Sequence, residues 1–319
     1  MKNNSKCKLL ANCRNFSDIE KKFIKLGEKR FKKFAVAQTK DILLIGKNAT
    51  LLKSFFKAAG YKKNQLNFLE LFERFMSYPY EISSKYYEAI LWGESNLLPE
   101  MTTNQIHKDL QPFYQQIWEQ WWRIRKPKKR QIKWIKHGIR PQNHPERRIA
   151  AICKFIKNFS IEPFAFFYEE INKAKDIKIF EKNIYSLIQQ NDNLWNNFYN
   201  FKKSTPINSA IFGKSRANDF IINGLLPTLY AQTMLPENDN GKFHNDILTD
   251  RSKILHLWLS MKNSVKNQIT IEVSERCNLT LEEMKIISKS NACSQGAIEL
   301  YKEYCSPCLQ ICKNCNLDI

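Results

Sequence analysis

Residues 50–75 read TLLKSFFKAAGYKKNQLNFLELFERF, and this stretch decides the expected fold. Its large apolar side chains recur at intervals of three and four residues, which is the spacing along one face of an α-helix. Thr50 is a candidate N-cap, and Gly60 is a candidate helix terminator in the left-handed conformation. A second helix with a wide buried face is expected from Asn64 to Phe75. The stretch therefore predicts two consecutive helices that are divided at Gly60.

The same spacing continues through most of the chain, which only nine Gly and eleven Pro residues interrupt. Pro145 predicts the first turn of a helix, because its missing N–H needs no partner there. We expect core helices over residues 220–231 and 254–261, a loop at residues 238–241, and a short strand over residues 268–273, where apolar residues alternate. The predicted fold class is all-α, a multi-helix domain with a short Cys-rich metal-binding knuckle at its C-terminal end.

The composition describes a folded, strongly basic protein. Its 319 residues contain 51 Lys and Arg against 31 Asp and Glu, a net charge of +20, and 43% of them are hydrophobic, more than disordered chains carry. No uncharged stretch reaches the about 20 apolar residues of a transmembrane helix, and the first sixteen residues lack the apolar region of a signal peptide. We therefore expect a cytoplasmic protein with no membrane partner.

The charge is concentrated in residues 121–148, which we call the basic segment. Lys supplies 39 of the 51 cations, and an AT-rich genome adds Lys and Asn to any solvated surface. Arg does not accumulate in this way, yet six of the twelve Arg lie in the basic segment, which holds eleven cations and one acid, Glu146. This clustering predicts an anionic partner, namely nucleic acid, either DNA or RNA.

The candidate phosphate-binding residues share this segment and its positive charge or hydrogen-bonding capacity. They are Arg123, Arg125, Lys128, Lys129, Arg130, Lys133, Lys136, Arg140, Asn143, His144, Arg147 and Arg148. Helix entry at Pro145 adds exposed N–H groups and a positive dipole end that suit a phosphate. The alternative is that Arg147 and Arg148 pair with acids elsewhere in the chain.

Four Trp residues lie in or beside the basic segment, and exposed indoles can stack on unpaired bases. Trp121, Trp122 and Trp134 are the candidates for stacking. Large aromatic residues at helical spacing are more often part of a core, so both readings remain open.

The most specific chemical pattern is the C-terminal series Cys305-x2-Cys308-x3-Cys312-x2-Cys315. Clustered Cys in a chain without a secretory signal indicates metal ligation rather than disulfides, and four thiolates suit a structural zinc site. An iron–sulfur cluster is the alternative cofactor, and a stripe of small buried side chains is the non-metal alternative.

The spacing of these cysteines limits how they could surround one ion. On a single helix they would span roughly 15 Å, so the backbone must turn. We expect Zn²⁺ on Cys305, Cys312 and Cys315, with Cys308 or Cys293 as the fourth ligand. The other cysteines lack partner spacing and are expected to be buried or incidental thiols; they are Cys7, Cys13, Cys153 and Cys277.

No catalytic residue can be assigned from the sequence. The nine Gly form no phosphate-binding loop, dinucleotide fingerprint or nucleophile elbow, and no two of the five His have metal-binding spacing.

Several stretches resemble the uncharacterised bacterial family named domain of unknown function 2851. They are LGEKRF at residues 26–31, AGYKKN at 59–64, GIRPQNHPERR at 138–148, and the stretch from SQG at 294–296 to Cys315. Longer proteins that the chain resembles begin with a β-rich part that is similar to restriction-type nucleases, with a Gly-Pro-Asp-Phe element and a Glu-x-His. This chain has neither element, so the resemblance implies a helical companion of a nuclease-like part and carries over no catalytic residue.

The expected organisation has three parts, which can also form one continuous domain. Residues 1–117 form an N-terminal helical part, residues 118–290 hold the basic segment and a helical core, and residues 291–319 form the Cys-rich tail. The expected function is nucleic-acid binding without catalysis, beside a separately encoded nuclease-like subunit. The alternatives are a protein-interaction scaffold that docks an acidic partner, and a nuclease-type enzyme whose site is not recognisable.

Overall fold

The computed structural model describes residues 7, 13, 15–99, 106–126, 130–174, 176–205, 208–236, 244–263 and 267–306, with the backbone alone for residues 244–249. Within these residues the protein is all-α, and the only extended pairings are isolated β-bridges. The all-α part of the predicted fold class is therefore confirmed, whereas most of the predicted Cys-rich knuckle lies outside the described residues. No helix among the described residues is long and apolar enough to cross a membrane.

The chain divides into two compact units that each combine segments distant in sequence. Unit 1 contains residues 1–40, 174–181 and 226–319, and unit 2 contains residues 41–173 and 182–225. Helices α1 (Phe16–Ile45) and α7 (Ile177–Ile188) contribute residues to both units.

The helices of unit 2 are α2 (Lys47–Met76), α3 (Tyr80–Glu94), α4 (Gln111–Ile124), α5 (Pro145–Phe159), α6 (Phe164–Lys173) and α8 (Lys214–Phe220), with the short turns η3 (Lys108–Leu110), η4 (Pro141–Asn143), η5 (Trp195–Asn197) and η6 (Ile221–Leu225). Those of unit 1 are α9 (Leu226–Gln232), α10 (His244–Ser260), α11 (Gln268–Arg276), α12 (Leu281–Lys289), α13 (Asn291–Leu300) and the π-turn η7 (Tyr301–Cys305). Helix α5 begins at Pro145, and residues 220–231 and 254–260 are helical, as the sequence predicts.

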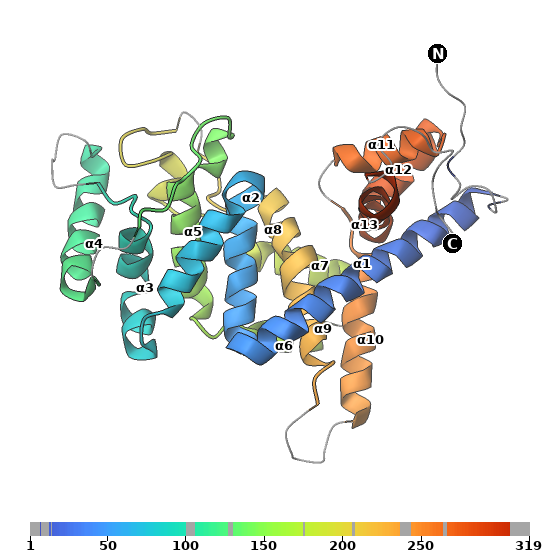
Figure 1. Cartoon of the computed structure of the whole chain (residues 1–319), viewed down its shortest axis with the longest axis horizontal. Coiled ribbons are helices and arrows are strands. Elements are labelled where there is room, and N and C mark those ends of the chain that lie inside the picture. Colours follow the sequence, from blue (N-terminus) through green and yellow to red (C-terminus); the bar gives the residue numbers. More distant parts are fainter. Residues whose placement is uncertain are drawn as a thin grey trace. The chain divides into compact units, whose positions relative to one another are not determined.

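Aromatic packing forms the centre of unit 2. Helix α2 packs against α3 and α5, and α3 packs along α4 (Figure 1). The Phe55 ring lies 4.0 Å from that of Phe155, 4.6 Å from Phe212 and 5.0 Å from Phe220, measured between centroids. A Cβ at Gly93 of α3 would lie 2.0 Å from the indole of Trp121, so this glycine permits the close approach of α4.

The interruption of α2 differs in detail from the prediction. The helix begins at Lys47 rather than after Thr50, whose hydroxyl donates to the Gly46 carbonyl at 2.8 Å. The residue with a non-helical, positive φ is Tyr61 (φ 49°) rather than Gly60. Gly60 is instead required for packing, because a Cβ there would lie 2.7 Å from the Gln65 Cα.

The strand expected over residues 268–273 is wrong, because these residues begin helix α11. The Asn267 side chain caps this helix by accepting from the Ile269 N–H at 2.9 Å. Val273 and Cys277, which are one helical turn apart, are both buried. Burial of a helical face therefore outweighs the β preference of a short run of Ile, Thr and Val.

Unit 1 depends on a close crossing between α1 and α13. A Cβ at Gly296 would lie 1.9 Å from the Phe23 carbonyl oxygen, and one at Gly27 would lie 2.2 Å from the Ala292 carbonyl oxygen. One turn further along, the buried Glu299 carboxylate accepts from Arg30 at 3.2 Å and from Lys33 at 2.5 Å. The stretches around Gly27 and Gly296 thus face each other.

Beside this crossing lies an apolar cluster, which we call the unit 1 core. Its buried members are Cys7, Phe23, Leu26, Val273, Cys277, Ile287, Cys293, Ala297 and Leu300. Tyr301, Tyr304 and Cys305 of η7 pack against it and are partly buried. The unit 1 core therefore joins residues from both ends of the chain.

We predict that Gly296→Ala destabilises unit 1, because its methyl group would overlap the Phe23 backbone. Overpacking of this kind costs about 1–3 kcal/mol, which should lower the thermal unfolding midpoint. Gly213→Ala is the matched control, since a Cβ at Gly213 has no atom within 4 Å, and its midpoint should stay near wild type. Equal midpoints for both variants would contradict the proposed crossing.

Candidate nucleic-acid interface

Residues 130–140 of the basic segment are not helical, and side chains of α2 supply their backbone hydrogen bonds. The buried Asn64 amide donates to the Ile135 carbonyl and accepts from the Ile135 N–H, both at 2.9 Å. Asn67 donates to the Lys133 carbonyl at 2.9 Å. Because a side-chain amide carries the donor and acceptor of a peptide group, Asn64 takes the place of a neighbouring strand.

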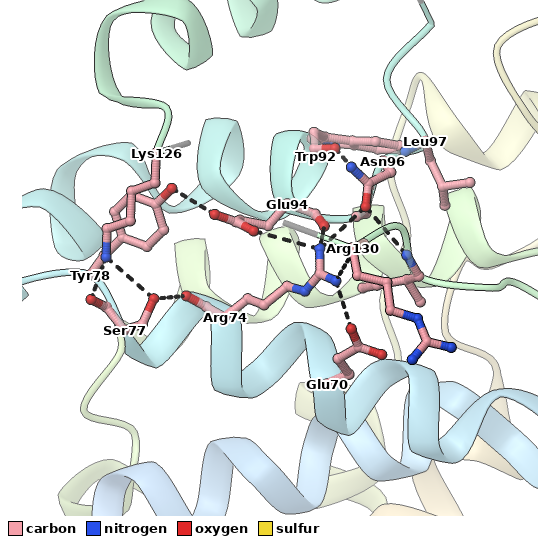
Figure 2. A network of polar contacts seen from close by, with 12 residues as sticks. Glu70, Arg74, Ser77, Tyr78, Trp92, Glu94, Asn96, Leu97, Lys126 and Arg130 are labelled. Carbon is pink, nitrogen blue, oxygen red and sulfur yellow. Dashed lines mark hydrogen bonds and ion pairs between the residues drawn. The ribbon is translucent and has the colours of Figure 1, made fainter. Parts of the chain in front are cut away.

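The start of this stretch is held by Arg74, a buried cation of α2 (Figure 2). Its Nη2 donates to the Arg130 carbonyl and to the Glu70 carboxylate, the latter at 2.6 Å. Its Nη1 donates to the Glu94 carbonyl at 3.0 Å and to the Asn96 side chain at 3.2 Å. One guanidinium thus joins α2, the end of α3 and the basic segment.

The Glu94 carboxylate is also buried and balances this guanidinium, with Oε2 3.7 Å from Arg74 Nη1. Its Oε1 accepts from the Tyr78 hydroxyl at 2.8 Å (Figure 2). Burial and the contact with Glu94 raise the pKa of Tyr78, so the hydroxyl remains a donor. Lys126, just after α4, donates to the Ser77 carbonyl at 2.6 Å, which fixes the end of α4 on α2.

With the backbone held in this way, six cations of the basic segment are exposed to solvent. Ile132 is buried, whereas the cations around it are exposed; these are Arg123, Arg125, Arg130, Lys133, Lys136 and Arg140. No Asp or Glu occurs between Glu119 and Glu146. Among the described residues, Lys136 is the only one of these six cations in an ion pair, with Glu146 at 3.0 Å.

Glu146 also holds His144, which lies just before α5. The Glu146 Oε2 is 2.5 Å from the His144 Nδ1. Burial acts to raise the pKa of Glu146, but hydrogen bonds and charge from His144 and Lys136 together lower it. The ionised Glu146 carboxylate therefore stabilises the fold at pH values above its ordinary pKa. This stabilisation is lost as the pH falls through the lowered pKa of the folded state. His144 and Lys136 are thus attached to the start of α5.

Arg147 and Arg148 differ from the exposed cations because both are buried, at 0% and 4% relative exposure. The Arg147 guanidinium donates at 2.7–3.3 Å to the carbonyls of Trp195, Asn196, Phe198, Ser209 and Ala210. Arg148 donates to the Ile211 carbonyl at 2.6 Å and to the Asn143 side chain at 2.5 Å. Among the described residues, these two guanidinium groups contact neither an exposed surface nor an acid; they bind backbone carbonyls of residues 195–198 and 209–211.

Burial lowers the pKa of both side chains, and for Arg148 the neighbouring Arg216 and Arg147 add to the effect. Both remain protonated at neutral pH because arginine starts from so high a value. The carbonyl oxygens then compensate two buried positive charges.

The three tryptophans considered for stacking lie in different environments. Trp121 is half-buried against Gly93, and Trp134 donates from Nε1 to the Ser95 carbonyl at 2.7 Å. Trp122 is 49% exposed, and the Arg125 guanidinium lies over its ring. Trp122 alone of the three offers a large exposed surface.

Several predicted site residues lie outside the described residues, namely Lys128, Lys129, Cys308, Cys312 and Cys315. Cys305 ends η7, and Cys293 is fully buried in the unit 1 core. Within the described part of the chain, no three His, Cys, Asp or Glu side chains gather as a metal would require.

A family model described as a protein of unknown function (DUF2851) matches residues 31–250. The chain belongs to the DUF2851 family. The match covers the basic segment and the side chains that hold it, so the resemblance seen in the sequence is confirmed for this part. No curated protein and no solved structure matches the chain.

The sequence did not reveal the residues that hold the segment in this DUF2851 protein, chiefly Asn64, Arg74 and Glu94. For Arg74 a signal was present: it lies beside Phe72 and Phe75 on the face expected to be buried. A cation on a buried face needs partners, and these came from segments that sequence spacing could not locate.

We predict that Arg147→Ala lowers the free energy of unfolding by about 3 kcal/mol or more. Several buried carbonyls would lose their donor, and each such loss costs about 1–3 kcal/mol. Chemical denaturation would measure the change. Arg147→Lys should recover only part of this stability. The single ammonium of Lys cannot donate to both sets of carbonyls that the two ends of the Arg147 guanidinium reach. Arg140→Ala, at an exposed position, should unfold like wild type, and wild-type stability of Arg147→Ala would refute the structural role.

Proposed function

We propose that the basic segment binds the phosphate backbone of nucleic acid. The observation that supports this is that the backbone of residues 130–140 is held in place. Asn64, Asn67 and Arg74 bind its carbonyls at residues 130, 133 and 135 and its N–H at residue 135. The side chains beside them remain exposed and positive, with no acid in the stretch. Such cations release the counterions of a nucleic acid on binding.

The proposed contacts are Arg123, Arg125, Arg130, Lys133, Lys136 and Arg140, together with Lys128 and Lys129 between them in sequence. Asn143 and His144 are engaged with Arg148 and Glu146, so we assign them a supporting role. We leave Arg147 and Arg148 out of the surface because they are buried. Trp122 is the proposed stacking residue.

We further propose that this chain binds the nucleic acid and that a separately encoded nuclease-like subunit cleaves it. The resemblance to longer proteins with a nuclease-like part supports this division. The first alternative is a scaffold that docks an acidic protein, and the second is an enzyme with its own site. Mg²⁺-dependent cleavage of the probe by the purified chain would favour the second alternative.

A structural zinc site on the C-terminal cysteines is the second part of the proposal. The spacing from Cys305 to Cys315 supports it, as does the cytoplasmic location we propose, where thiols stay reduced. Cys305, Cys312 and Cys315 would supply three thiolates. An iron–sulfur cluster is the alternative occupant.

We predict that the protein purified without oxygen carries about one equivalent of Zn²⁺, because four thiolates bind this ion tightly. Elemental analysis of the full chain would measure zinc and iron together. Protein without metal would contradict the proposed site. Iron together with acid-labile sulfide would show that the site holds an iron–sulfur cluster instead of zinc.

For the basic segment, we predict that the logarithm of affinity falls linearly with the logarithm of salt concentration, by about 0.9 per phosphate contact on duplex DNA or about 0.7 on single strands. The variant with Arg130, Lys133 and Arg140 all changed to Ala should bind more weakly and shallow this slope by about 2 to 3 units. Fluorescence anisotropy with labelled DNA and RNA would measure both quantities.

A matched variant separates this surface from the general charge of the protein. Lys57, Lys202 and Lys203 are also exposed cations of unit 2, and changing all three to Ala removes the same charge. It should leave the slope near wild type. Equal losses in both triple variants would show that binding depends on net charge alone, and preference for an acidic polypeptide over nucleic acid would favour the scaffold.

A further inference from the structure

A second group of cations lies beside the basic segment in unit 2, although the sequence places it elsewhere. Lys62 and Lys63 follow the interruption of α2 at Tyr61, and Lys214 is the first residue of α8. All three lysines are exposed and belong to the same compact unit as the basic segment. Sequence spacing gives no sign that these stretches are neighbours.

Two side-chain contacts bring the stretches together around the interruption of α2. The Lys63 Nζ donates to the Gly138 carbonyl at 2.9 Å, which joins α2 to the basic segment. The Arg216 guanidinium lies over the Tyr61 ring, 4.2 Å from its centroid, which joins the start of α8 to the same point. We call the cations of residues 61–63, 138–140 and 214–216 the junction surface; they are Lys62, Lys63, Arg140, Lys214 and Arg216, and these stretches contain no acid.

The lysines of the junction surface carry charge that is not neutralised by an acid. Arg216 differs from them, because its Nη1 lies 2.7 Å from the Asp219 carboxylate. In the described part of the chain, no ion pair involves Lys62, Lys63 or Lys214. Lys63 uses one of its three N–H donors within the fold and keeps two. These ammonium groups are therefore available to an external anion.

Buried positive charge lies next to this surface. Arg148 is 4% exposed and donates to the Ile211 carbonyl and the Asn143 side chain. Burial lowers the pKa of Arg148 to about 9, and repulsion from the neighbouring Arg216 and Arg147 adds to the effect. Buried charges are screened less than exposed ones, so positive potential accumulates at this place. An anion bound at the junction surface would relieve part of the repulsion.

We infer that Lys62, Lys63 and Lys214 bind the phosphate backbone of the same nucleic acid, on a surface continuous with Arg140 of the basic segment. This inference rests on the proposed function and extends its binding surface. A polyanion fits better than a single small anion, because the cations come from three stretches and adjoin those of residues 130–140. Lysine ammonium groups act as point charges, so the contacts should be independent of base sequence.

The test compares two double variants of the full-length chain by fluorescence anisotropy with labelled DNA and RNA at several salt concentrations. Changing Lys62 and Lys214 to Ala should weaken binding and shallow the salt slope by about 1.4 to 1.8 units, from about 0.7 or 0.9 per lost contact. Changing Lys85 and Lys202 to Ala removes the same charge from other exposed positions of unit 2. This control should keep the wild-type slope.

Two further features separate a phosphate contact from a structural role. Lys63 is left unchanged, because its bond to the Gly138 carbonyl also holds the basic segment. The variant in which Lys62 and Lys214 are changed to Arg keeps both charges and should keep the wild-type slope. Thermal unfolding midpoints of all these variants should stay near wild type, because the altered side chains are exposed.

The outcomes distinguish this inference from the proposed function. Wild-type protein that binds no nucleic acid would refute the proposed function, and the junction surface with it. Binding that weakens when Arg130, Lys133 and Arg140 are changed to Ala, but not when Lys62 and Lys214 are, would refute the junction surface alone. Equal slope changes in the two double variants would also refute it, since net charge would then explain the effect.

Discussion

The constraint on which unit 2 depends is that buried backbone groups need hydrogen-bond partners. In helices the backbone meets this need itself, but residues 130–140, 198–205 and 208–211 are irregular apart from isolated β-bridges. Buried side chains from helices supply the partners, Asn64 and Arg74 for the first stretch and Arg147 for the second. Among the described residues, unit 2 thereby holds two largely irregular stretches in fixed positions without a β-sheet.

This constraint also explains why the arginines of the basic segment fall into two groups. Arg147 lies in the first turn of α5, whose inner face is buried, and its planar guanidinium reaches carbonyls on both sides. Arg130 and Arg140 lie in the non-helical stretch, where side chains of α2 hold the backbone and the arginine side chains are exposed. The same residue type, clustered in sequence, is buried and structural at the C-terminal end of the basic segment and exposed at Arg123, Arg125, Arg130 and Arg140.

The helical class and the start of α5 could be predicted because local spacing determines them. The backbone conformation at Gly60 and Tyr61 could not be predicted in this way. The positive φ lies at Tyr61, while Gly60 is packed closely against Gln65 in the next turn. Residues 268–273 were misread because their β preference is local, whereas the burial of Val273 is a tertiary effect. The same limit applies to the basic segment, where the cations were visible in sequence but the side chains that hold them were not.

Unit 1 shows the same dependence on distant contacts in a different form. Gly27 and Gly296 allow two helices to cross at backbone contact, and Glu299 gathers Arg30 and Lys33 one turn away. Because the crossing fixes α13 on α1, it also fixes η7, and with it Cys305, at the core that contains Cys7. Spacing alone makes Cys7 an isolated thiol, whereas the fold places it in the apolar cluster against which Cys305 packs. The place of these two cysteines at the unit 1 core therefore follows from helix packing rather than from the cysteine spacing.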